Sequence, residues 1–245
     1  MSTGTDLFAP LLPVRLPVRG RDERFPVHRI YCVGRNFADH AREMGAEVPA
    51  QRGTPARGTP VFFLKPADAL VTDGVVPFPR GTHELHHEVE LVVALGHDAP
   101  AGLLDPRAAQ SLVFAYGVGL DLTRRDLQAA AKAKGLPWDT GKAFDDSAPV
   151  SELVPADAVG ELATRTLSLR VNRELRQHGA LSDLVWNVPD ILRELSALYA
   201  LRAGDLVFMG TPAGVGPLRV GDTFAASLDG VVELHGRIAP ARTVR

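Results

Sequence analysis

The stretch LHHEVELVVALG, residues 85–96, decides the architecture of the chain. Its alternation predicts a β-strand on which Glu88 and Glu90 share one face, while Val89 and Leu91 point to the other. The apolar residues that follow predict a buried strand, where unpaired carboxylates are costly. Two like charges this close resist ionising together unless a cation lies between them. A metal ion and cross-strand salt bridges to arginine or lysine both meet this requirement, and this stretch alone leaves both open.

The other predicted elements are segregated along the chain instead of alternating regularly. Strand or helix patterns occur at residues 28–34, 37–45, 60–66, 106–121, 122–135, 188–201 and 204–238. Residues 168–179 predict a hairpin that turns near Asn172 and Arg173. This segregation favours an α+β fold over a doubly wound parallel sheet.

Length and composition indicate one globular unit, with a leading segment at residues 1–27 and a single domain at 28–245. The chain has 245 residues, and 45% of them are hydrophobic, which is enough for a buried core. Its 27 basic and 29 acidic side chains give a net charge of -2, so we expect no nucleic-acid partner. Because we find neither a membrane-length apolar stretch of ~20 residues nor a signal-peptide pattern, we expect a cytoplasmic protein without a membrane partner.

Two familiar metal-site patterns do not fit the sequence. The single cysteine, Cys32, excludes a cysteine-cluster site and an internal disulfide. Residues 83–87, HELHH, match the zinc-protease pattern HExxH, which requires a helix to bring both histidines onto one face. Here the motif runs directly into a strand pattern, so we interpret it as polar residues at a strand entrance.

Asp121 adds a third candidate carboxylate. It ends one predicted strand and begins a predicted helix, on which Arg125 and Gln128 follow at positions i+4 and i+7. Such a stripe can hold a divalent cation and a carboxylate ligand together, although an ordinary ion pair on a solvated helix face has the same pattern. Three carboxylates without cysteine favour a hard cation, Mg²⁺, Mn²⁺ or Ca²⁺, over zinc.

His40 and Glu43 form a candidate acid–base pair. They are three residues apart on a predicted helix, where a carboxylate orients a neighbouring imidazole and raises its basicity. A general base for activating water is built in this way, but a solvated surface helix can carry the same pair for no functional reason. The glycine-rich loop at residues 210–216, GTPAGVG, can present N–H groups and the Thr211 hydroxyl to an anion, or it can be a plain turn.

Taken together, the residues resemble those of the fumarylacetoacetate hydrolase family. The matching segments are, in order, GRNFADHAREMG, FFLKPADALV, LHHEVELVVALG, GLDLTRRDLQ, KGLPWDTGKAFDDSAPV, VNRELRQHG and GDLVFMGTPAGVG. The resemblance extends from Ile30 to the C-terminus, and GLPWDTGKAFDDSAPV and DLVWNVPDIL are most similar to the acylpyruvate hydrolases, especially the fumarylpyruvate hydrolases of gentisate breakdown. It implies a mixed β-sheet roll with short peripheral helices, a lid segment at residues 37–59, and a homodimer.

The resemblance also implies which residues form the site. It places Mg²⁺ or Mn²⁺ on Glu88, Glu90 and Asp121, catalysis on His40, Glu43 and Lys142, and substrate binding on Arg125, Gln128 and Thr211. Arg35 is our candidate for binding a distal carboxylate of the substrate. Three positions depart from the family pattern: Arg173 replaces a turn glycine, and Met209 and Ala143 replace hydroxyl-bearing residues, which we expect to affect substrate preference.

These implications predict a metal-dependent hydrolase that cleaves a carbon–carbon bond in a 2,4-diketo acid, converting fumarylpyruvate to fumarate and pyruvate. His40 would take a proton from water, which attacks the distal carbonyl, and Lys142 would stabilise the oxyanion. Decarboxylation of a diacid such as oxaloacetate, isomerisation or tautomerisation of an oxo acid, and simple oxo-acid binding remain alternatives at the same metal site.

Overall fold

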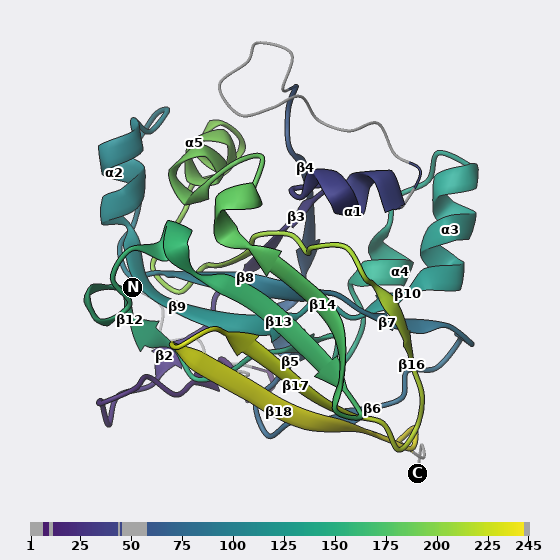
Figure 1. The fold of residues 1–245 in the computed structure, drawn as a ribbon. Coiled ribbons are helices and arrows are strands. Elements are labelled where there is room, and N and C mark those ends of the chain that lie inside the picture. Colours follow the sequence, from purple (N-terminus) through teal and green to yellow (C-terminus); the bar gives the residue numbers. More distant parts are fainter. Residues whose placement is uncertain (1–6, 10–11, 44, 46–57, 243–245) are drawn as a thin grey trace.

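A six-stranded mixed sheet forms the centre of the computed structural model, which describes residues 7–9, 12–43, 45 and 58–242 (Figure 1). In spatial order its strands are β12 (Val154–Pro155), β9 (Val113–Leu120), β8 (Val89–Leu95), β15 (Leu206–Phe208), β3 (Ile30–Gly34) and β4 (Val61–Lys65). β15 and β3 are parallel, and the other neighbouring pairs are antiparallel. The strand pattern predicted over residues 85–96 is observed as two strands in different sheets, β7 (Leu85–His87) and β8, with Glu88 between them, and every residue of β8 is buried.

A five-stranded sheet packs across one face of the central sheet (Figure 1). Its strands, in spatial order, are β14 (Glu174–Ala180), β13 (Thr166–Val171), β17 (Thr223–Leu228), β18 (Val232–Ala239) and β6 (Val75–Pro77). Leu91 and Val93 of β8 lie with Leu167 and Leu169 of β13 in the apolar core between the two sheets. One side of the central sheet is therefore filled by aliphatic residues and is closed to ligands.

The opposite face of the central sheet is covered by short strands and by part of the leading segment. Two small sheets contribute: β1 (Arg15–Leu16) with β2 (Phe25–Pro26), and β5 (Leu70–Val71) with β11 (Ala148–Pro149). Cys32, Val92 and Phe208 share a second apolar core with Leu16 and Phe25. A third small sheet contains β10 (Thr123–Arg124), β7 (Leu85–His87) and β16 (Gly216–Leu218).

The helices are short and lie around the sheets (Figure 1). They are α1 (Ala38–Glu43), α2 (Pro106–Ser111), α3 (Arg125–Ala133), α4 (Asp139–Lys142) and α5 (Val188–Leu198), with 3₁₀ turns η2 (Ala67–Ala69), η3 (Ala156–Ala158), η4 (Leu162–Thr164) and η5 (Leu181–Asp183). The start of α5 follows from its sequence: Asn187 caps the helix by accepting the Asp190 N–H at 2.9 Å, and Pro189 occupies the first turn. The predicted α+β class is confirmed.

Two local predictions can be compared directly with the structure. Residues 85–87 of the HELHH motif form a strand, so the two outer histidines do not share a helix face. The β13–β14 hairpin turns at Asn172 and Arg173, whose φ angles are 50° and 72°. Arg173 thus adopts the left-handed conformation that favours the glycine usual in the family.

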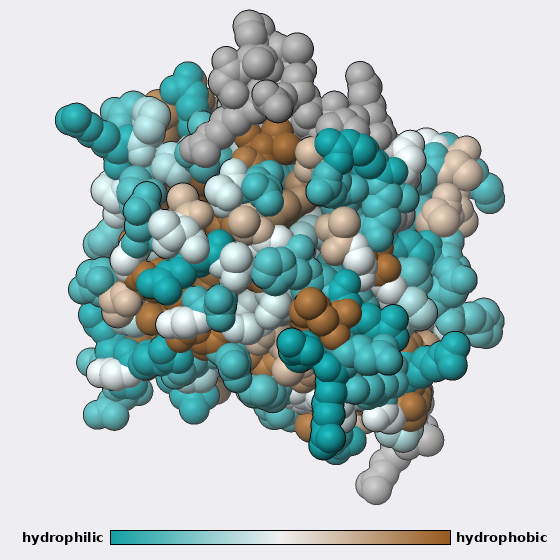
Figure 2. All heavy atoms as spheres, viewed as in Figure 1, coloured by the Kyte–Doolittle hydropathy of each residue, from teal (hydrophilic) through white to brown (hydrophobic). Residues whose placement is uncertain are grey.

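Only part of the predicted lid can be described. Residues 37–43, 45 and 58–59 belong to the described structure, whereas residues 44 and 46–57 lie outside it. The face seen in Figure 2 is mostly hydrophilic, with apolar residues in small groups. Among the described residues, no helix has the length and apolar character to span a membrane.

Candidate active site

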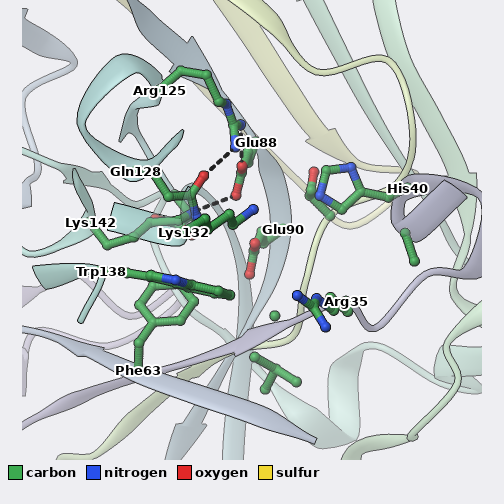
Figure 3. A pocket seen from close by; sticks show the side chains of 15 residues that line it. Arg35, His40, Phe63, Glu88, Glu90, Arg125, Gln128, Lys132, Trp138 and Lys142 are labelled. Atoms are coloured by element: carbon green, nitrogen blue, oxygen red, sulfur yellow. Dashed lines mark hydrogen bonds and ion pairs between the residues drawn. The ribbon is translucent and has the colours of Figure 1, made fainter. Parts of the chain in front are cut away.

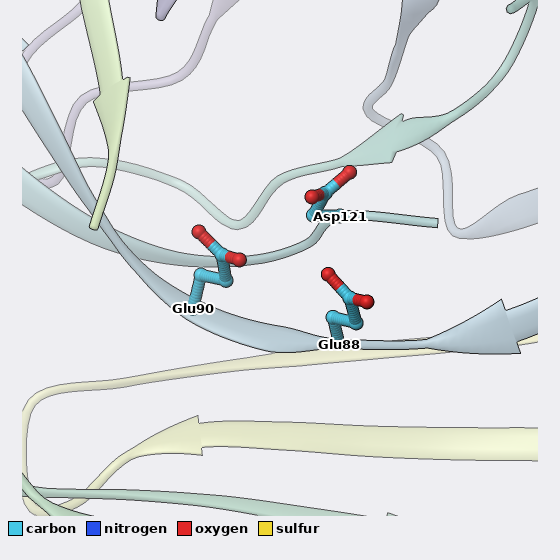
Figure 4. Close-up of side chains that lie close together, drawn as sticks. All are labelled: Glu88, Glu90 and Asp121. Carbon is cyan, nitrogen blue, oxygen red and sulfur yellow. The ribbon is translucent and has the colours of Figure 1, made fainter. Parts of the chain in front are cut away.

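The register between β8 and β9 brings three carboxylates together. Glu90 lies opposite Gly119, and just beyond the paired residues the Asp121 N–H donates to the Glu88 carbonyl at 2.9 Å. Because alternate residues of a strand share a face, all three acidic side chains project to the same side of the sheet (Figure 4). One oxygen from each carboxylate lies within 4.8 Å of those of the other two, and all three residues are buried. We call Glu88, Glu90 and Asp121 the carboxylate cluster.

Buried basic side chains neutralise part of this cluster. Lys142 Nζ lies 2.6 Å from Glu88 Oε2 and 2.5 Å from Asp121 Oδ2. Arg125 forms an ion pair with Glu88, and Lys65 Nζ lies 2.9 Å from Asp121 Oδ1. The salt bridges that the sequence leaves as an alternative to a metal ion are therefore present for two of the three carboxylates. We call the carboxylate cluster and these three cations the pocket floor.

Glu90 is the exception on the floor. Among the described residues it has no salt-bridge partner, and its Oε2 accepts the Gly210 N–H at 2.7 Å. Burial, together with the charges of Asp121 and Glu88, raises the pKa of Glu90 well above the ordinary carboxyl value. The cluster therefore lacks positive charge beside Glu90, and a hard divalent cation shared by the three carboxylates would supply it. The residues fit Mg²⁺ or Mn²⁺.

Ion pairing fixes the charge states of Glu88 and Lys142. Burial opposes ionisation of Glu88, but Lys142 and Arg125 outweigh it and hold the pKa of this carboxyl well below its usual range. Burial also opposes the charge on Lys142, but Asp121 and Glu88 outweigh it and raise the pKa of the ammonium group. Lys142 is therefore protonated at neutral pH, which makes it a hydrogen-bond donor rather than a general base.

Helix α1 carries the predicted pair. His40 Nδ1 lies 3.2 Å from Glu43 Oε2, and Glu43 Oε1 accepts the Gly214 N–H at 3.0 Å. The carboxylate favours the tautomer with its hydrogen on Nδ1, which leaves Nε2 as an acceptor. Burial lowers the pKa of His40, although the charges of Glu88 and Glu43 raise it, so the imidazole is neutral at pH 7. The structure forms the pair, and its catalytic role stays a prediction.

One pocket joins the carboxylate cluster to His40 (Figure 3). Every predicted site residue except Glu43 lines it. The space between the lining side chains, including the open mouth, is about 460 Å³. Phe63 and Trp138 form an aromatic wall, with ring centroids 6.1 Å apart. The pocket thus combines a charged floor, a neutral imidazole and an aromatic wall of two tilted rings.

Two amide side chains orient polar groups in and around this pocket. Gln128 Oε1 accepts a hydrogen bond from Arg125 Nη1 at 2.6 Å, which fixes the guanidinium above Glu88. Gln177 Nε2 donates to Thr211 Oγ1 at 2.8 Å. Since the threonine oxygen accepts this bond, its own hydroxyl hydrogen is available to an oxygen of a bound ligand.

The helix-stripe interpretation of Asp121 is wrong. Helix α3 begins only at Arg125, because β10 intervenes after Asp121. Asp121 instead lines the same pocket as Arg125 and Gln128 from the end of β9. Of the other departures from the family pattern, neither Met209 nor Ala143 lines the pocket, so nothing in the described structure connects them to substrate preference.

Sequence analysis missed five side chains that shape the site. They are Phe63, Lys65, Lys132, Trp138 and Gln177. Lys132 carried a usable signal, because positions 125, 128 and 132 fall on one face of a helix. Lys65 ends an apolar strand, and a buried lysine requires an acidic partner. Gln177 carried no such signal, because its partners come from other sheets.

Comparison with known proteins gives the same architecture and site class. The model of the fumarylacetoacetate (FAA) hydrolase C-terminal family matches residues 29–239. The chain is 41% identical over 210 residues to the mouse protein named mitochondrial oxaloacetate tautomerase FAHD1, covering 85% of this chain and 90% of the mouse protein. It is 40% identical over 208 residues to the Escherichia coli oxaloacetate tautomerase YcgM, covering 84% and 90% of the two chains.

Solved structures of similar proteins have the same fold as this chain. A fumarylpyruvate hydrolase from Pseudomonas aeruginosa in complex with Mn²⁺ and pyruvate superposes with a TM-score of 0.88 at 43% identity, covering 96% of this chain and 100% of the other. The mixed-sheet fold and buried carboxylate cluster define a metal-site enzyme that acts on small molecules. The chain belongs to the fumarylacetoacetate hydrolase family.

Proposed function

We propose that this protein is a metal-dependent hydrolase of 2,4-diketo acids, with fumarylpyruvate as its substrate. The observation that carries this proposal is the neutral, carboxylate-oriented imidazole of His40 in the same pocket as the carboxylate cluster. Hydrolysis needs a base for water as well as a metal site. The similarity to the Pseudomonas aeruginosa fumarylpyruvate hydrolase over 96% of this chain supports the same assignment.

In the proposed reaction, His40 starts the attack. Its Nε2 accepts a proton from water, and the oxygen adds to the distal carbonyl carbon of the substrate. Lys142 donates hydrogen bonds to the oxyanion, and Arg125 and Thr211 bind the 2-oxo acid end. The bond between the attacked carbon and the neighbouring methylene then breaks, and its electron pair stays with the pyruvate fragment as an enolate. The proton that His40 took from water then passes to the methylene carbon of this enolate, which yields pyruvate beside fumarate.

The ion would be held by the carboxylate cluster. Bound Mg²⁺ or Mn²⁺ would polarise the 2-oxo acid group and stabilise the negative charge that develops there. Lys142 already bridges Glu88 and Asp121, so its ammonium group lies where a reacting oxygen beside the cluster would need a donor. Glu43 would hold His40 in the productive tautomer throughout.

Tautomerisation of oxaloacetate is the second candidate function. It is favoured by the 40–41% identity to the mouse and Escherichia coli oxaloacetate tautomerases. This reaction requires proton transfer between carbon and oxygen but no attacking water. His40 would serve as the transferring group in that case as well.

A substrate comparison with the Mn²⁺-loaded protein separates the candidates. Fumarylpyruvate, acetylpyruvate and oxaloacetate are supplied in turn, and loss of enol absorbance is followed together with formation of fumarate, acetate or pyruvate. The hydrolase proposal requires fumarate and pyruvate in equal amounts. Enol–keto conversion of oxaloacetate without cleavage of either acylpyruvate would reject it in favour of the tautomerase. Pyruvate formed from oxaloacetate would indicate decarboxylation, and binding without turnover would indicate a binding module.

We also propose a homodimer, on the resemblance to the family. Light scattering coupled to size-exclusion chromatography measures the mass directly. The chain mass is 26.3 kDa, so a particle of that mass would contradict the dimer.

A further inference from the structure

Two cations at the pocket mouth have no carboxylate partner among the described residues. Arg35 follows strand β3, Lys132 lies in the last turn of α3, and both side chains line the pocket (Figure 3). Arg35 is half-buried and Lys132 is exposed. By contrast, each cation of the pocket floor lies within ion-pair distance of Glu88 or Asp121. We call Arg35 and Lys132 the pocket mouth.

The two mouth cations are close enough to affect each other. Although Lys132 as a whole is exposed, partial loss of water around its ammonium group is the main cause of its lowered pKa. The charges of Arg125, Lys142 and Arg35 lower this pKa further, and the charge of Glu88 raises it. The ammonium group lies 5.0 Å from the centroid of the Trp138 ring, which holds it at the edge of the pocket. Among the described residues no carboxylate lies within ion-pair distance of either mouth cation, and a bound anion would relieve the repulsion between the two.

The backbone of Arg35 points to the same conclusion. Its φ is 60°, in the left-handed region that is unfavourable for a residue with a Cβ. Glycine is the residue that adopts this conformation at little cost, and Gly34 stands immediately before it. Residues held in such conformations cluster at ligand-binding sites. The strained backbone therefore holds a guanidinium at the pocket mouth.

We propose that Arg35 and Lys132 form a subsite for the distal carboxylate of the substrate, so that the protein selects dicarboxylic 2-oxo acids over monocarboxylic ones. This inference rests on the proposed function in one respect, that the 2-oxo acid end binds at the floor. The floor cations are already engaged by Glu88 and Asp121. The positive charge available to a second carboxylate is therefore at the mouth. The neighbouring Phe63 and Trp138 rings, tilted at 57° to each other, offer apolar surface to the chain that joins the two carboxylates.

Two ligands that cannot be hydrolysed test the subsite. 2-Oxoheptanedioate and 2-oxoheptanoate have the same chain length and the same 2-oxo acid end, and they differ only in the terminal carboxylate. Neither has the second oxo group that the hydrolytic reaction attacks. Calorimetric titration of the Mn²⁺-loaded protein should show at least about tenfold tighter binding of the diacid, as expected for hydrogen bonds to charged groups.

Substitutions then assign the preference to the mouth. Lys132→Met and Arg35→Met should each weaken binding of the diacid about tenfold and leave the affinity for the monoacid unchanged. Lys134→Met is the matched control. Lys134 follows the last residue of the same helix, α3, is exposed, and does not line the pocket. Unaltered thermal midpoints would show that each variant folds.

The outcomes separate this inference from the proposed function. Equal affinity of the unaltered protein for both ligands, or variants that weaken both ligands alike, would overturn the subsite. A fumarylpyruvate assay on the same preparation tests the hydrolase. Diacid preference without turnover would leave the subsite standing and reject the hydrolase, whereas turnover without preference would do the reverse.

Discussion

The floor and the mouth of the pocket use cations in opposite ways. On the floor, Lys65 and Lys142 are buried and lie within 3 Å of carboxylates, on elements attached to the central sheet. At the mouth, Arg35 and Lys132 are less buried and have no acidic partner among the described residues. The difference follows from the cost of burial. A charge removed from water must be neutralised inside the protein, whereas a charge at the surface is stabilised by water until a ligand replaces it.

The largest effect is expected on the floor, from Glu90→Gln. The amide can still accept the Gly210 N–H, so the fold should persist, but the third anionic ligand is lost. Changes to residues that only contact a metal ligand cost up to about 100-fold in metal affinity. Loss of a ligand itself should therefore lower the Mn²⁺ affinity by more than that, and turnover should be lost with it. Calorimetric titration with Mn²⁺ measures this. An isotherm like that of the unaltered protein would exclude Glu90 as a ligand.

His40→Ala should separate metal binding at the pocket floor from catalysis. Without the base, fumarylpyruvate hydrolysis should slow by about 10²- to 10⁴-fold. Mn²⁺ and oxalate should still bind with near-normal affinity, because the carboxylate cluster is untouched. Steady-state kinetics and calorimetry on one preparation provide both readings. Undiminished turnover would remove His40 from the mechanism.

Lys65→Met and Lys132→Met compare floor with mouth directly. Removing Lys65 leaves the buried Asp121 with fewer positive neighbours, so the metal-free protein should lose about 3 kcal/mol of unfolding free energy, the low end for breaking a buried pair because Lys142 remains. Lys132→Met should change it by less than about 0.5 kcal/mol, as usual for surface substitutions. Denaturant unfolding without metal tests both values. Equal losses would refute the contrast between floor and mouth.

The pH dependence of hydrolysis reports on the His40–Glu43 pair. His40 must be neutral to accept a proton, and burial lowers its pKa below 6.5. The acidic limb of kcat/KM should therefore lie below pH 6.5, with activity lost as the pH falls. Glu43→Gln removes a charge that raises this pKa, so the limb should move to lower pH, and the maximal rate should drop about 10- to 100-fold. An acidic limb that Glu43→Gln does not move would contradict the pairing.

The smallest effect concerns the strained arginines. Arg35 and Arg173 both have left-handed backbones, at φ 60° and 72°. Substituting glycine relieves about 1–2 kcal/mol of backbone strain in the folded state. The greater freedom of glycine in the unfolded chain offsets about 0.5–1 kcal/mol of that gain. Arg35→Gly and Arg173→Gly should therefore each raise stability slightly in thermal unfolding. Only Arg35→Gly should also lose the preference for the diacid. Equal loss in both variants would show that this preference does not arise at the pocket mouth.

The parts of the site that were predictable from sequence are those with short-range geometry. The alternation of a strand is local, so it placed Glu88 and Glu90 on one face. The spacing of a helix is equally local, and His40 and Glu43 do meet at 3.2 Å. Asp121 was predicted as a ligand from a helix stripe that the structure does not contain. The pairing of β8 with β9 is what brings Asp121 to Glu88.

The sequence by itself determined the buried strand β8, the helix α5, the shared face of Glu88 and Glu90, and the turn at Asn172, because each depends on residues a few positions apart. Only the tertiary structure decided that Lys65 neutralises Asp121, and that Arg35 and Lys132 line one pocket with no acidic partner among the described residues. These relations depend on the order of strands and on depth from solvent, and both arise only when distant segments pack together.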